Sequence, residues 1–354
     1  MAEVVNLLEA FVEALPEPVL VIGRQQRIVA ANSAARALFP ALRVQNTLPF
    51  VLRAPDVLEA TARVLAGGPA TLTMLHERVP VERLFQVHAA PFLAAGEAYA
   101  VLTLRDLTDA RRVERMRVDF IANASHELRT PLASLLGFIE TLQGAAREDS
   151  VARERFLAIM RDQGRRMARL IDDLLSLSKV EQQEHVRPQT PVDLVEVVRH
   201  CIDGLTPMAQ ESGVHLHLDA PMDTPMSLIL AGDRDELLRV AENLIENAIK
   251  YGAGPAGSQS RIDIALQAQG SLARLTVRDF GPGIPAEHLP RLTERFYRVA
   301  AGASRAKGGT GLGLALVKHV VARHRGTLKI ASQPGQGAEF IVEFPLLVPE
   351  KVVL

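Results

Sequence analysis

The chain of 354 residues contains one cysteine, Cys201, and no tryptophan. A single cysteine excludes a disulfide within the chain and leaves a cysteine-based zinc site short of ligands. We therefore interpret Cys201 as a small, partly buried apolar residue, which fits a reducing cytoplasm. Aromatic residues make up only 4% of the sequence, so a platform that stacks nucleic-acid bases is not expected.

An excess of charge of one sign is also missing, because 40 basic residues face 41 acidic ones. Nucleic-acid binders usually carry a basic excess, so no nucleic-acid partner is expected. No apolar run approaches the length of about 20 residues that a membrane helix needs. The N-terminal segment is acidic and does not resemble a signal peptide. We expect a soluble, cytoplasmic protein, with peripheral attachment to a membrane as the alternative.

Residues 1–106 mix short β-like runs with turn residues, which favours a small α+β domain with an antiparallel sheet. Asn32 is placed to cap a helix that runs through Phe39. The predicted strands cover residues 19–22, 28–30, 72–75, 84–90 and 99–104.

Residues 107–185 change to helical periodicity. Apolar residues recur at steps of 3 and 4 from Val113 to Leu142, and a second such stripe runs from Phe156 to Leu177. The second stripe reads as a heptad seam with one polar member, Gln163. The pattern predicts a helical hairpin, and two hairpins would bury both stripes in a dimeric four-helix bundle. Two prolines then mark a linker, before residues 190–348 alternate helices and strands with glycine-rich loops.

His126 stands out on the first of these helices. It lies two residues from the stripe members Ala124 and Leu128, hence about 200° around the helix from each, and should face solvent. Glu127 follows it and can reach the ring. A carboxylate that binds one imidazole N–H fixes the tautomer and leaves the other nitrogen free to attack. A lone exposed histidine, however, is usually an ordinary surface residue.

Three later segments could bind a nucleotide. Asn243, Asn247 and Lys250 share one helix face, where amide oxygens suit Mg²⁺ and an ammonium suits phosphate. The segment DFGPGIP begins with Asp279 at the end of a strand-like run, where a carboxylate can accept a hydrogen bond from an exocyclic amine such as adenine N6. Taken alone, the first pattern more often marks a solvated helix face, and the second more often marks a tight turn.

The third segment, GGTGLGLALVKHV over residues 308–320, opens a helix with a glycine-rich loop. Backbone N–H groups at a helix N-terminus can cradle phosphate. A dinucleotide-binding fold would need a strand directly before the glycines. The preceding residues 300–308 are small and polar, which favours a lid over a strand.

Over about residues 107–346 the sequence resembles the histidine protein kinases of two-component systems. FIANASHELRTPL resembles their phosphoacceptor box, ENLIENAIKYG the N box, DFGPGIP the G1 box, TERFYRV the F box and GGTGLGLA the G2 box. All five follow the family's order. The kinase half is most similar to the phosphate-regulon type, although such kinases usually carry N-terminal membrane helices, which this chain lacks. The lid also lacks the charged residue that usually follows the F box.

The resemblance implies a role for each matching residue. His126 would be phosphorylated, with Glu127 as general base and Thr130 positioning water for dephosphorylation of the partner. Asn247 would bind Mg²⁺. Phe296 would anchor the lid. The remaining nucleotide contacts would be Asn243, Lys250 and Tyr251 in the N box, Asp279, Gly281 and Gly283 in the G1 box, and Gly309, Gly311, Leu312 and Gly313 in the G2 box.

The N-terminal region resembles a PAS domain, in ALPEPVLVIGRQQRIVAAN and LRDLTDARRVE. The implied fold is multidomain α+β: a PAS-like sensor domain at 1–106, a dimeric helical hairpin at 107–185, and at 190–348 an α/β-sandwich ATP-binding domain of the histidine kinase and Hsp90-like type.

The implied function is a homodimeric sensor histidine kinase that uses ATP and Mg²⁺. It would transfer phosphate from His126 to a response regulator receiver domain, would also act as a phosphatase on that regulator, and would serve phosphate-starvation signalling. A scaffold that binds ATP without catalysis is one alternative. An ATPase of the same superfamily is another, although such ATPases lack the SHELRTPL helix.

Overall fold

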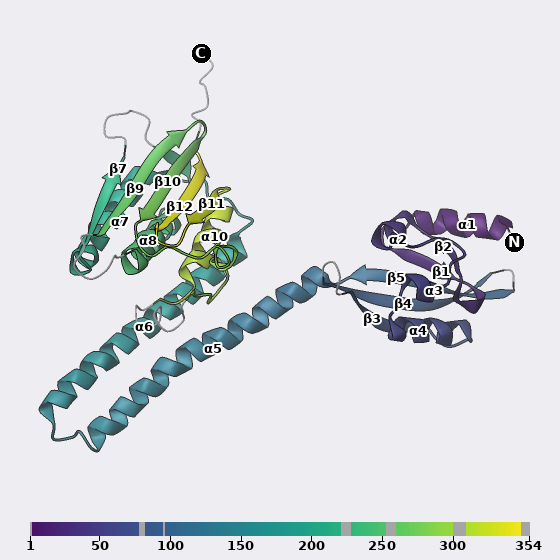
Figure 1. Ribbon diagram of the computed structural model, residues 1–354, viewed down its shortest axis with the longest axis horizontal. Helices are drawn as coiled ribbons and strands as arrows, with labels where there is room; N and C mark the ends of the chain where they lie inside the picture. Colours follow the sequence, from purple (N-terminus) through teal and green to yellow (C-terminus); the bar gives the residue numbers. More distant parts are fainter. Residues whose placement is uncertain are drawn as a thin grey trace, which may run out of the picture. The chain divides into compact units, whose positions relative to one another are not determined.

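The computed structural model describes residues 2–77, 82–94, 96–220, 228–252, 260–299 and 309–347. The chain divides into two units, Met1–Ile121 and Ala122–Leu354, and the boundary falls inside a long helix, α5 (Figure 1). The three-domain division with boundaries at 106, 107, 185 and 190 stays a prediction. No helix within the described ranges has an apolar stretch long enough to cross a bilayer.

The first unit contains a five-stranded sheet in the order β2-β1-β5-β4-β3, and every pair in it is antiparallel. This confirms the predicted antiparallel sheet and its five strands. The fourth strand is longer than predicted, because pairing with its neighbour continues to Ala94 at the hairpin. The strands are β1 Val19–Ile22, β2 Ile28–Ala31, β3 Thr71–Glu77, β4 Arg83–Ala94 and β5 Glu97–Asp106.

Helices pack on both faces of this sheet. The main core lies between one face and the helices around α4, and a smaller cluster with Val12, Val19 and Tyr99 lies under α1 on the other. The helices are α1 Ala2–Glu13, η1 Arg24–Gln26, α2 Ser33–Leu38, α3 Leu48–Val51 and α4 Pro55–Leu65. Of these, the sequence predicted α2 alone.

Asn32 caps α2 as predicted, and it also ties the first unit together. Its side-chain oxygen accepts the backbone N–H groups of Ala35 at 2.9 Å and Val19 at 3.0 Å. Its amide nitrogen donates to the carbonyls of Leu15 at 2.9 Å and Glu17 at 2.7 Å. The side chain is fully buried. All its hydrogen-bonding groups are thereby satisfied inside the core, which is the condition for burying an amide without a large cost.

Helices α5 Thr108–Gln143 and α6 Ser150–Gln183 form the predicted hairpin (Figure 1). Asp149 caps α6 by accepting the Ala152 N–H at 2.9 Å. The rings of Phe138 and Phe156 join the two helices near the loop, with centroids 5.1 Å apart. The predicted stripe of α6 faces inward, with Leu170 and Leu177 buried. Both helices therefore form where the periodicity predicted them, whereas the stripe members Val113, Met116 and Leu132 of α5 are exposed.

After the hairpin, the chain forms a mixed five-stranded sheet in the order β11-β12-β10-β9-β7, in which β7 and β9 pair in parallel and the others antiparallel. The strands are β7 Val214–Asp219, β9 Ser260–Gln269, β10 Leu272–Asp279, β11 Thr327–Ser332 and β12 Ala338–Pro345. A small ribbon pairs β6 Pro191–Asp193 with β8 Ile229–Ala231.

Three helices cover one face of this sheet: α7 Leu194–Glu211, α8 Arg234–Tyr251 and α10 Gly313–Arg323 (Figure 1). The DFGPGIP segment begins with Asp279, the last residue of β10, and a short helical turn, η2 Leu289–Arg291, follows the segment. Cys201 is buried on α7, and burial raises the pKa of its thiol to about 12. It is therefore the apolar core residue that the sequence predicted.

Candidate nucleotide and phosphoacceptor site

Helix α8 presents the predicted N-box residues on one half-buried face. Asp233 begins the helix by accepting the N–H groups of residues 235 and 236. Asn243, Asn247 and Lys250 lie opposite the buried face, and the Lys250 ammonium pairs with Glu246 at 2.6 Å. The buried face that packs under the sheet consists of Leu237, Val240, Ala241, Leu244, Ile245, Ala248 and Ile249. The three polar residues therefore share one half-buried face, as their spacing predicted.

Asp279 ends β10 and is 6% exposed. One carboxylate oxygen, Oδ1, accepts the N–H groups of Gly281 at 2.9 Å and Ala338 at 3.2 Å. Burial raises the pKa of this carboxyl, and the two N–H groups act in the opposite direction. Because Oδ1 is occupied, the other oxygen is the one placed to accept a hydrogen bond from a ligand amine.

Glycines keep the surroundings of Asp279 tightly packed. A Cβ at position 281 would lie 2.8 Å from the carbonyl oxygen of Tyr251 at the end of α8. Gly283 has a φ of +72°, and a Cβ there would overlap the Gln333 carbonyl. Both positions therefore exclude any larger residue. The G1 segment is thus held against the end of α8.

The F-box and G2 segments contact each other. The Phe296 N–H donates to the Gly311 carbonyl at 2.7 Å. Gly311 has a φ of +74°, and a Cβ there would lie 2.9 Å from the Phe296 backbone. The predicted anchor of the lid and the predicted phosphate loop are therefore neighbours. Lid residues 300–308 lie outside the described residues.

The G2 loop also meets the N box. A Cβ at Gly313 would overlap the side-chain oxygen of Asn243, whose amide nitrogen donates to the carbonyl of residue 239 at 2.8 Å. Leu312 is buried, and its N–H donates to the Thr310 hydroxyl at 3.3 Å. No side chain caps α10, so its first-turn N–H groups point toward the face that Gly309, Gly311 and Gly313 border. This is the arrangement that binds an anion at a helix N-terminus.

The phosphoacceptor turn lies on α5, where His126 is exposed as predicted. The Thr130 hydroxyl donates to the His126 carbonyl at 3.2 Å. The Glu127 carboxylate was expected to bind the His126 ring. It binds two arginines instead. Arg166 lies 3.3 Å from it and Arg298 lies 3.2 Å from it. Among the described residues nothing hydrogen-bonds the His126 ring, since two charged guanidinium groups attract this carboxylate more strongly than a neutral imidazole does.

Further polar contacts join α6 to the nucleotide-binding elements. Arg295 pairs with Glu181 at 2.6 Å, and His319 on α10 lies 3.1 Å from Glu184. In Figure 1, α10 lies beside the C-terminal half of α6. None of these four residues was assigned a role from the sequence. Their only local signal is that Glu181 lies in the last turn of α6 and Glu184 directly after it, which does not say what they contact.

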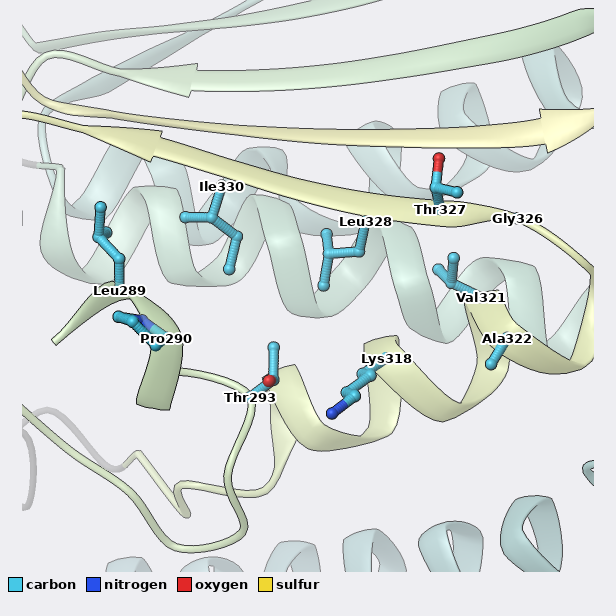
Figure 2. Close-up of a pocket in the computed structure, with 10 residues that line it drawn as sticks. All are labelled: Leu289, Pro290, Thr293, Lys318, Val321, Ala322, Gly326, Thr327, Leu328 and Ile330. Atoms are coloured by element: carbon cyan, nitrogen blue, oxygen red, sulfur yellow. The ribbon is translucent and has the colours of Figure 1, made fainter. Parts of the chain in front are cut away.

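A pocket opens elsewhere on this unit, between η2, α10 and β11 (Figure 2). It is lined by Leu289, Pro290, Thr293, Lys318, Val321, Ala322, Gly326, Thr327, Leu328 and Ile330. None of these is a predicted nucleotide residue. Of the lining residues, Thr293 begins the F box, and the others lie outside the N, G1, F and G2 boxes.

Three family models match the chain. The model of the PAS fold matches residues 12–112, and the His Kinase A (phospho-acceptor) domain matches residues 116–183. The model of the histidine kinase-, DNA gyrase B- and HSP90-like ATPase matches residues 232–348. The resemblance to a PAS domain, a phosphoacceptor hairpin and an ATP-binding domain is thereby confirmed.

Two sensor proteins are similar to this chain. The phosphate regulon sensor protein PhoR of Pseudomonas aeruginosa is 39% identical over 70% of this chain and 54% of its own length. The sensor-like histidine kinase SenX3 of Mycobacterium tuberculosis is 35% identical over 74% of this chain and 62% of its own length. The chain belongs to the sensor histidine kinases. It spans between 54% and 62% of the length of these two relatives.

Solved structures of histidine kinases are also similar to this kinase. The histidine kinase AdeS of Acinetobacter baumannii is 27% identical, with a TM-score of 0.49, over 63% of this chain and 98% of that one. The histidine kinase ThkA in complex with the response regulator protein TrrA is 21% identical, with a TM-score of 0.49, over 97% of this chain and 99% of that one.

The position of Asp279 predicts that this residue contributes to ATP affinity. Asp279→Asn should weaken ATP binding about 30-fold, because one charged hydrogen bond of about 2 kcal/mol is lost and an NH₂ group then faces the adenine amine. The fold should survive, since the asparagine oxygen can replace Oδ1 toward Gly281 and Ala338. Calorimetric titration with ATP measures the effect, and Asp203→Asn on the exposed side of α7 is the control. Equal ATP affinity in both variants would contradict the assignment of Asp279.

Proposed function

We propose that this chain is a sensor histidine kinase that uses Mg-ATP to phosphorylate His126 and then passes the phosphoryl group to an aspartate of a response regulator. The observation that carries the proposal is the ion pair between Glu127 and Arg298 at 3.2 Å. Glu127 follows the exposed His126, and Arg298 lies two residues beyond Phe296 of the F box. The pair therefore joins the phosphoacceptor turn directly to the flank of the nucleotide site.

The residues of the site fit Mg-ATP. Asp279 would hold the adenine amine, and the N–H groups at the start of α10 would hold phosphates. No cluster of three acidic, histidine or cysteine residues suited to a metal occurs within the described ranges. Nucleotide-bound Mg²⁺ needs only one or two protein oxygens beside phosphates and water, which Asn247 on α8 supplies. Bound there, the ion would neutralise negative charge on the phosphates.

The chemistry requires little covalent work from the protein. One ring nitrogen of His126 forms a bond to the γ-phosphorus while the bond to the ADP oxygen breaks. The proton on the other ring nitrogen passes to Glu127, once that carboxylate has left its arginines. An aspartate of the regulator then attacks the labile phosphohistidine. Thr130, exposed one turn beyond His126, would orient water for the reverse role as phosphatase.

Homodimerisation would complete the hairpin. Leu132 and Leu136 on α5 are 47% and 53% exposed, and Leu157 on α6 is 51% exposed. A second hairpin would cover these side chains in a four-helix bundle. Exposed apolar surface of this kind is a common feature of dimer interfaces. The likeness to a phosphate regulon sensor protein supports phosphate limitation as the signal class.

Incubation with γ-labelled ATP tests the proposal. We expect label on the protein that is stable to base and labile to acid, as a phosphoramidate is. Release of free phosphate without labelled protein would identify an ATPase instead, and nucleotide binding without either product would identify a scaffold. Transfer of the label to a panel of receiver domains then identifies the regulator.

A further inference from the structure

Helix α6 brings a carboxylate to the predicted phosphate-binding loop. Thr310 lies between Gly309 and Gly311, and its hydroxyl donates to Asp173 of α6 at 2.8 Å. The same hydroxyl oxygen accepts the N–H of Leu312, the residue directly before α10, at 3.3 Å. A short chain of hydrogen bonds therefore runs from the residue before α10, through Thr310, to a negative charge on α6.

The negative charge of Asp173 has little compensation from nearby basic groups. Burial raises the pKa of the Asp173 carboxyl, and Glu246 on α8 acts in the same direction, whereas Thr310, Arg239 and Arg169 lower it. Within the described ranges no basic group forms an ion pair with Asp173 at 4.0 Å or less. Arg169, one turn earlier on α6, pairs instead with Glu246 at 3.9 Å and is 52% exposed. Such an exposed and distant pair contributes little.

We propose that Asp173 is a positioning residue that opposes the binding of nucleotide phosphates. It ties α6 to the loop through Thr310 while the loop is empty of anions, and the charge of a triphosphate in the loop repels it. Repulsion is strong there because the carboxylate is poorly solvated. By linkage, docking of the ATP-binding elements on α6 and triphosphate binding must then weaken each other. This inference rests on the proposed function, since it assumes that the loop binds ATP.

The charge can be removed while the hydrogen bond is kept. In Asp173→Asn the amide oxygen can still accept the Thr310 hydroxyl. The matched control is Asp172→Asn, which makes the same charge change at the next residue of α6, where the side chain is exposed. Both variants are made in the full chain, and the affinities for ATP, ADP and adenosine are measured at pH 8 and low salt.

We expect Asp173→Asn to bind ATP about fivefold more tightly than the wild type, because one nearby repulsive charge is gone. The gain should be smaller for ADP and absent for adenosine, which carries no phosphate. Asp172→Asn should behave as the wild type. A gain that is equal for ATP and adenosine would point to a structural change and would overturn the proposal, as would an unchanged ATP affinity.

A stability measurement and a second variant complete the test. Thermal unfolding shows whether Asp173→Asn is folded. If that variant is unfolded, Asp173→Ser, which also removes the charge, is used in its place. Wild-type protein that binds none of the three ligands would defeat the proposed function together with this inference. Wild-type protein that binds ATP normally, with no gain in Asp173→Asn or Asp173→Ser, would defeat this inference alone.

Discussion

Replacing His126 with alanine should abolish the transfer of phosphate from γ-labelled ATP to the protein while leaving ATP binding unchanged. The expected loss is complete because no other side chain of this turn is a comparable nucleophile. Thr130 is exposed one turn away, but its hydroxyl donates to the His126 carbonyl and, among the described residues, forms no hydrogen bond with a carboxylate or imidazole. An unactivated hydroxyl is a weak nucleophile at neutral pH.

ATP binding should persist because the nucleotide residues lie on other elements, on α8, at the end of β10 and at the start of α10. Labelling and calorimetric titration with ATP are therefore measured on the same preparation. His185→Ala is the control, because this histidine is also exposed and follows the other helix of the hairpin. Label on His126→Ala at the wild-type level would sink the mechanism, whatever the ATP affinity.

Local patterns predicted the parts of the site that lie within one element. The two apolar stripes located α5 and α6, and the spacing of Asn243, Asn247 and Lys250 placed them on one face of α8. Both results follow from the helical period alone. The helices α1, α3 and α4 were missed, although Pro55 at the first position of α4 is a recognised start signal. Helix α3 has only four residues, too few to show a period.

Partners far apart in the sequence could not be predicted in this way. The carboxylate of Glu127 is paired with Arg166, 39 residues away, and with Arg298, 171 residues away. Asp173 and Thr310 are separated by 137 residues. No periodicity relates such positions, because the packing of separate elements brings them together. The sequence therefore predicts Glu127 as the general base, but it did not predict the contacts of this carboxylate with Arg166 and Arg298.

Replacing Glu127 with glutamine should strongly slow the labelling of His126. A glutamine cannot take the proton that leaves the His126 ring, so labelling should slow about 100-fold, the lower range for loss of a general base. ATP affinity should stay the same, since residue 127 lies on α5, outside the nucleotide pocket. The glutamine oxygen can still accept a hydrogen bond from Arg166 or Arg298, so part of the contact survives.

The alternative is that Glu127 acts only by docking α5 against the nucleotide-binding elements. Arg298 is 7% exposed, and its buried Nε has no partner among the described residues, so loss of the Glu127 charge also leaves a guanidinium poorly compensated. Glu181→Gln separates the two roles, because Glu181 forms a similar ion pair with Arg295 at 2.6 Å but lies far along the chain from His126. A general base predicts a much slower reaction for Glu127→Gln alone. Equal slowing in both variants would show that Glu127 contributes to docking and not to proton transfer.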